Sequence, residues 1–165
     1  MGFHADSSAR HVPTHPLRAG SEGSALRALT GGDAMFLLDT NTLIYFFKGQ
    51  GTVAERLFAT PPAEVAISAV SFYEIEVGIE KSAHPVKRRR QFDGFLAVVS
   101  VLPLDRAGAR AAATVRADLE RRGLPIGPLD NLIAGIALAH RAILVTRNTR
   151  EFSRLPDLAV TDWYD

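Results

Sequence analysis

The sequence alternates between short apolar runs and longer segments in which apolar residues recur with helical spacing, beginning at Met35. The short runs predict strands at residues 35–38, 65–68, 100–104, 142–146 and 158–161. The longer segments predict helices at residues 42–48, 52–59, 70–82, 86–98, 107–122, 128–140 and 149–154. Alternation of this kind is typical of an α/β fold in which helices flank a parallel sheet.

Four polar side chains stand near the carboxyl ends of these predicted strands. Asp39 ends the first strand, and Glu74 lies on the helix after the second. Asp130 is in the first turn of the helix before the fourth strand, and Asn148 follows that strand. Because right-handed crossovers bring the carboxyl ends of parallel strands to one edge of the sheet, we expect the four to converge where α/β proteins bind ligands.

Each acid also has a structural interpretation. Asp39 is well placed to cap a helix, and Asp130 to interact favourably with a helix dipole. Asp130, however, stands among apolar residues, where an unpaired charge is costly and a cation would relieve it. On the third acid's helix, periodicity only weakly favours Glu74 over Glu76 as the inward-facing residue.

Residues 1–34 differ from the rest of the chain, since they are rich in Ser, Gly, Ala and Pro and hold three of the five histidines. They contain no apolar run long enough for a signal peptide or a membrane span. We expect a disordered extension, either native or upstream of a natural start at Met35. Residues 35–165 then form the single folded domain.

Composition narrows the chemistry. The 165 residues include no cysteine, which excludes disulfides, thiolate metal sites and a cysteine nucleophile and suits the cytoplasm. The formal net charge of +1 gives no overall basic field that would indicate nucleic-acid binding. Beyond residue 34 the only histidines are His84 and His140, neither spaced with the acids as a zinc or iron site requires. Oxygen-ligand metals, Mg²⁺ or Mn²⁺, are therefore the better match, and such ions support phosphodiester hydrolysis.

Four motifs follow one another along the chain: MFLLDTN from Met35, FYEIEVG from Phe72, IGPLDNLIA from Ile126 and LVTRNTREF from Leu144. In this order they resemble the PIN-domain ribonucleases of the VapC toxin family. The resemblance implies a Rossmann-like parallel sheet and a metal-dependent endoribonuclease that acts on structured RNA such as tRNA or rRNA. It also implies a homodimer and inhibition by a cognate antitoxin, with no membrane association.

The same resemblance assigns roles to individual residues. Asp39, Glu74 and Asp130 correspond to the metal-binding acids, and the glycine four residues after Glu74 selects it over Glu76. Polar residues that resemble those lining the family's site are Thr40, Asn41 and Thr146.

The chain departs from the family pattern at Asn148, where many PIN nucleases carry a fourth acid. An amide oxygen coordinates a metal or a metal-bound water but adds no charge, so the pattern leaves open whether one or two metals bind. Glu151, three residues later, is an alternative source of the fourth carboxylate.

Several basic residues are candidates for contact with the RNA backbone. Arg147 and Arg150 flank the predicted acidic site and are the stronger candidates. The basic run at residues 87–90 and the pair at 121–122 are alternatively solvated helix faces. The apolar residues 43–47 belong to the core or in part to an antitoxin or dimer surface.

Two other classes of function compete with the nuclease. A haloacid-dehalogenase-type phosphatase is disfavoured because its motif requires a second Asp where this chain has Asn41. The stronger rival is a catalytically weak PIN-like module that binds RNA or a protein partner, with its site weakened at Asn148.

Overall fold

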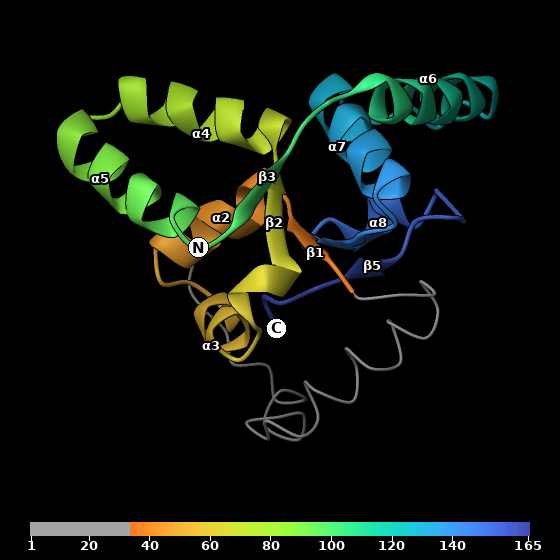
Figure 1. Cartoon of the computed structure of the whole chain (residues 1–165). Helices are drawn as coiled ribbons and strands as arrows, with labels where there is room; N and C mark the ends of the chain where they lie inside the picture. Colours follow the sequence, from red (N-terminus) through yellow and green to blue (C-terminus); the bar gives the residue numbers. More distant parts are fainter. Residues whose placement is uncertain (1–33) are drawn as a thin grey trace.

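A computed structural model describes residues 34–165. Its centre is a five-stranded sheet in the order β3-β2-β1-β4-β5, and every neighbouring pair is parallel (Figure 1). The strands are β1 (Phe36–Leu38), β2 (Val65–Ser68), β3 (Ser100–Leu102), β4 (Ile143–Val145) and β5 (Val160–Thr161). The predicted parallel α/β architecture is confirmed.

Helices connect successive strands of the sheet. They are α2 (Thr40–Phe47), α3 (Val53–Phe58), α4 (Ala69–Glu80), α5 (Pro85–Leu96), α6 (Arg106–Arg121), α7 (Pro128–Ala139) and α8 (Thr149–Phe152), with a short 3₁₀ turn at Pro62–Glu64. Every predicted element is present with ends within two residues of those expected, and the 3₁₀ turn was not predicted. β2 has the predicted bounds. The other four strands are shorter than expected, in β4 and β5 because the flanking apolar residues Ala142 and Leu158 are buried without joining the ladder.

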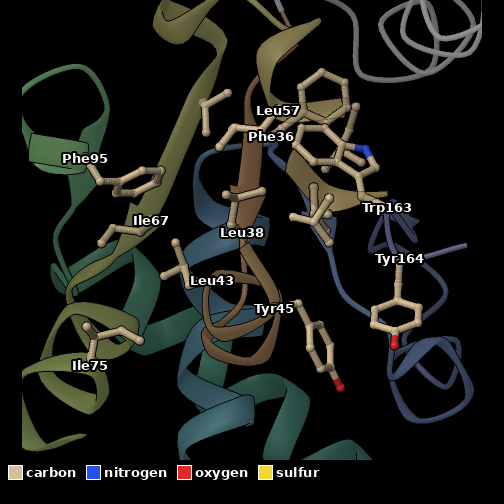
Figure 2. Close-up of a cluster of buried hydrophobic side chains, with 14 of the residues drawn as sticks. Phe36, Leu38, Leu43, Tyr45, Leu57, Ile67, Ile75, Phe95, Trp163 and Tyr164 are labelled. Atoms are coloured by element: carbon tan, nitrogen blue, oxygen red, sulfur yellow. The ribbon is translucent and has the colours of Figure 1, made fainter. Parts of the chain in front are cut away.

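The sheet is covered on both faces, because side chains alternate along each strand. Phe36 and Leu38 pack into one core cluster with residues of α2, α3, α4 and α5 (Figure 2). Leu37, between them, faces the second cluster, which is formed mainly by α6, α7 and α8. Ala34, the last residue of the extension expected at residues 1–34, is buried in the first cluster. The rest of that extension, residues 1–33, lies outside the described residues.

Close packing of α6 against α7 fixes the second face. A Cβ placed on Gly135 of α7 would lie 2.5 Å from the Ala112 Cβ of α6, so only glycine fits there. Nearby, the Asn131 side-chain N–H donates a 3.0 Å hydrogen bond to the Ala112 carbonyl. Asp130 precedes Asn131 in the first turn of α7, so this contact also sets the position of that acid.

Within residues 34–165, no helix is both long enough and apolar enough to cross a membrane. The apolar segment at residues 43–47 belongs largely to the core. Leu43 and Tyr45 are buried, and the other members pack against the first cluster, namely Ile44, Phe46 and Phe47.

Candidate active site

Asp39 lies at the carboxyl end of β1 and is almost fully buried, with 5% of its surface exposed. Its Oδ1 accepts a 2.7 Å hydrogen bond from the Thr42 backbone N–H, so Asp39 caps α2 as the structural interpretation predicted. The Thr146 hydroxyl donates a second bond to this carboxylate. Burial nevertheless raises the pKa of Asp39 above its usual value, because desolvation outweighs these hydrogen bonds. The cap therefore leaves the negative charge only partly compensated.

Glu74 faces the start of α2 from the first half of α4. The Thr40 hydroxyl donates a 2.7 Å hydrogen bond to Glu74 Oε1, and the Ser71 Oγ lies 3.0 Å from the same Thr40 oxygen. Glu76 instead forms an ion pair with Arg89 of α5. The structure thus brings Glu74, and not Glu76, to the end of β1.

Asp130 connects these acids electrostatically. Burial, together with the negative charges of Asp39, Glu74 and Glu151, raises the pKa of Asp130 to about 6. Carboxylates affect each other in this way only when they are near one another, so Asp39, Glu74 and Glu151 all lie near Asp130. We call Asp39, Glu74, Asp130 and Glu151 the acidic edge.

Asn148 reaches this region through Glu151. Its side-chain N–H donates a 2.8 Å hydrogen bond to Glu151 Oε2, while its backbone N–H donates a 3.0 Å bond to the Thr146 hydroxyl oxygen. Asn148 thus holds the Glu151 carboxylate in this region. A fourth acid is present, but it is Glu151, three residues after the position where the family pattern has it. The sequence left this alternative open, since it gives no orientation for the amide.

The remaining predicted residues have different surroundings. Thr146 is buried beside Asp39, whereas Asn41 is exposed on α2 and, within residues 34–165, makes no side-chain hydrogen bond to the acidic edge. Arg147 and Arg150 are both exposed near the carboxyl end of β4. The basic pair at residues 121–122 forms ion pairs with Asp118 on its own helix.

Sequence reasoning missed two buried serines that support Glu74. Ser68 ends β2 and caps α4, because its Oγ accepts a 2.9 Å hydrogen bond from the backbone N–H of Ser71. Ser71 in turn contacts Thr40. A strand that ends in serine, with a second serine three residues later, was the available signal.

The acidic edge provides hard oxygen donors without a cation of its own. Within the described residues 34–165, none of its four carboxylates takes part in a salt bridge. In the same part of the chain, no group of three His, Asp or Glu side chains is arranged as a ready ligand cluster. Mg²⁺ typically retains several waters and takes only one or two carboxylates directly, so this donor set fits such an ion without a closed protein shell.

Comparison with known proteins agrees with this geometry. Residues 36–158 match the PIN domain family. The tRNA(fMet)-specific endonuclease VapC of Shigella flexneri is 38% identical over 128 residues, which cover 78% of this chain and 97% of that protein. The protein of the same name from Salmonella typhimurium is 36% identical over 128 residues, with the same coverage. A chain in the crystal structure of DNA-bound VapBC from Salmonella typhimurium has a TM-score of 0.74 at 36% identity, covering 79% of this chain and 98% of that one.

Proposed function

The chain belongs to the VapC family of PIN-domain nucleases, and from this premise we propose that it is a toxin endoribonuclease that requires Mg²⁺ or Mn²⁺ and hydrolyses RNA phosphodiester bonds. Structured RNA such as tRNA or rRNA is the proposed substrate class. The observation that carries the proposal is the acidic edge, where Asp130 is electrostatically coupled to three other carboxylates and none of the four has a salt-bridge partner within residues 34–165. A purely structural role does not explain this arrangement, because it costs stability.

In this proposal Asp39 and Asp130 are the main metal ligands, and Glu74 either binds the ion or accepts a proton from the attacking water. A bound divalent ion supplies an activated water and stabilises negative charge on the leaving oxygen. Thr40 fixes one oxygen of Glu74 by a hydrogen bond. Thr146 holds Asp39 in the orientation set by its capping bond.

Glu151 contributes the fourth carboxylate, with Asn148 as its positioning residue. Glu151 would then supply the negative charge that is missing at position 148, where this chain has an asparagine and many PIN nucleases have an acid. The count of bound ions then depends on Glu151 as well as on the three acids identified from the motifs. Arg150 on α8 is proposed to contact RNA phosphates beside this edge.

We also propose a cognate antitoxin and a second copy of the chain as protein partners, acting in the cytoplasm. Support for the antitoxin comes from the similar solved structures, which include the VapBC complex of Salmonella typhimurium. The second copy rests on the family resemblance alone.

A cleavage assay tests the central proposal. Purified protein is incubated with total RNA and Mg²⁺ or Mn²⁺, alongside Asp39→Asn and a chelator control. Asparagine caps helices about as well as aspartate, so Asp39→Asn removes the charge and preserves the start of α2. We expect cleavage by the natural sequence that both the substitution and the chelator abolish. Equal background from both proteins would reject the nuclease and favour the catalytically weak binding module.

A further inference from the structure

A chain of three hydroxyl groups leads from the interior of the protein to Glu74. Ser68 Oγ at the end of β2 lies 3.3 Å from Ser71 Oγ on α4. Ser71 Oγ lies 3.0 Å from Thr40 Oγ1 on α2, and that oxygen lies 2.7 Å from Glu74 Oε1. Both serines are fully buried, whereas Thr40 and Glu74 are half-buried. The chain thus joins three separate elements and ends at one member of the acidic edge.

The direction of each hydrogen bond follows from the number of hydrogens available. An ionised carboxylate only accepts hydrogen bonds, so Thr40 gives its single hydroxyl hydrogen to Glu74. The contact between Thr40 and Ser71 then requires the hydrogen of Ser71. Ser71 has no second hydroxyl hydrogen, so Ser68 is the donor at the 3.3 Å contact. All three bonds therefore point toward Glu74.

Helix capping does not explain the side chain of Ser71. The cap of α4 uses the backbone N–H of Ser71, which any residue other than proline would provide at this position. Within residues 34–165, the hydrogen bonds of the Ser71 hydroxyl are those to Ser68 and Thr40. A buried hydroxyl costs stability unless it is hydrogen-bonded, so this one serves the contact with Thr40 and not the cap.

We propose that Ser71 is a positioning residue for Glu74 and that it acts through Thr40. The hydrogen of Ser71 occupies a lone pair of the Thr40 oxygen, which directs the single Thr40 hydrogen at the Glu74 carboxylate. Without Ser71 the Thr40 hydroxyl turns more easily to water, and Glu74 loses a fixed donor. For its effect on cleavage, the inference rests on the proposed nuclease function, in which Glu74 binds the ion or accepts a proton.

The first test observes Glu74 by NMR in the metal-free full chain at pH 8, without RNA. The glutamate carboxyl carbons are labelled with ¹³C, and the Glu74→Gln variant identifies the Glu74 resonance. We expect Ser71→Ala to shift this resonance in the same direction as Thr40→Val, and the double variant to resemble Thr40→Val alone. The matched control is Ser82→Ala, because the Ser82 hydroxyl donates to the Ile79 carbonyl just after α4. This control should leave the resonance in place.

An unshifted resonance in Ser71→Ala would overturn the proposal, because Thr40 would then direct its hydrogen without Ser71. Ser71→Thr restores the hydroxyl and should return the resonance toward its position in the natural sequence. A Ser71→Thr protein that resembles Ser71→Ala would count against the proposal as well. These measurements need neither metal nor RNA, so their result stands whether or not the protein is a nuclease.

Single-turnover cleavage of RNA tests the consequence for the reaction. Thr40→Val should lower the rate about 10-fold, the scale of one hydrogen bond to a charged group, and Ser71→Ala should cause most of the same loss. The double variant should be no slower than Thr40→Val, because Ser71 acts on Glu74 only through Thr40. Ser82→Ala should stay within about 2-fold of the natural rate. Losses that multiply in the double variant would show an independent action of Ser71 and overturn the proposal.

Discussion

Glu74 and Glu76 stand two residues apart on α4, yet their surroundings are opposite. Glu74 belongs to the acidic edge and is held by the neutral hydroxyl of Thr40. Glu76 belongs to the contact between α4 and α5, where Arg89 pairs with both Glu76 and Glu80. In the first region negative charges are gathered without a salt-bridge partner within residues 34–165, and in the second the two glutamates share one arginine.

This difference separates acids that serve the chemistry from acids that serve the fold. A carboxylate paired with arginine has lost much of its capacity to bind a metal, and it contributes modestly to stability. A carboxylate oriented by a hydroxyl has no cation beside it, and repulsion among such groups destabilises the protein until a cation binds. Residue type and helix are the same for both glutamates, so the partner is what distinguishes them.

The largest expected effect comes from exchanging each glutamate for glutamine. Glu74→Gln should lower kcat for RNA cleavage at least about 100-fold, because the amide neither binds the ion well nor accepts a proton. Glu76→Gln should leave the rate within about 2-fold, because Glu76 points to Arg89. Single-turnover cleavage of one RNA by both variants measures this. Equal losses in the two variants would contradict the separation.

The order of the elements followed from the sequence, whereas their lateral arrangement did not. Periodicity identifies strands and helices because it reflects which faces are buried. It does not state that β1 lies between β2 and β4, which is what places Asp39 beside Thr146. The convergence of acids was predictable only through the general rule that parallel strands end at one edge.

Within the site, the sequence located residues better than it located their partners. The sequence predicts Asp39 either as a helix cap or as a metal ligand. In the structure Asp39 caps α2, and its pKa is nevertheless raised by burial, so the cap does not exclude the second role. Helical spacing could not separate Glu74 from Glu76, since the decision depends on Thr40 and Arg89, which come from other elements. The role of Glu151 depends on the orientation of the Asn148 side-chain amide, which cannot be predicted from the pattern of residues.

An intermediate effect is expected on stability when one charge is removed from the acidic edge. The pKa of Asp130 is raised to about 6 in the folded protein, so the folded state binds its proton more tightly than the unfolded state does. Stability of the metal-free protein should therefore fall as pH rises between about 4 and 6 and stay lower above that range. Asp130→Asn should raise the free energy of unfolding at pH 8 by about 1 kcal/mol, a value reduced because the group is only half buried.

Urea denaturation of the metal-free proteins at pH 8 and at pH 4 measures this difference. Near pH 4 the natural carboxyl is largely protonated, so the advantage of the variant should disappear. Excess Mg²⁺ at pH 8 should reduce it too, because the ion neutralises the natural site. A variant that is no more stable at pH 8 would show that the acids are compensated.

The smallest expected effect lies in the contact between α4 and α5. Arg89→Ala should lower Tm by about 2 °C or less, because Arg89 is only partly buried and Glu80 is exposed, so solvent screens the ion pairs. The difference should vanish in high salt, which removes the attraction in the natural protein as well. RNA cleavage should be unchanged, since removal of Arg89 leaves the hydrogen bond between Thr40 and Glu74 intact. A loss of cleavage in this variant, with its Tm preserved, would mean that the pairing of Glu76 positions α4 for catalysis, and the two glutamates would then act together.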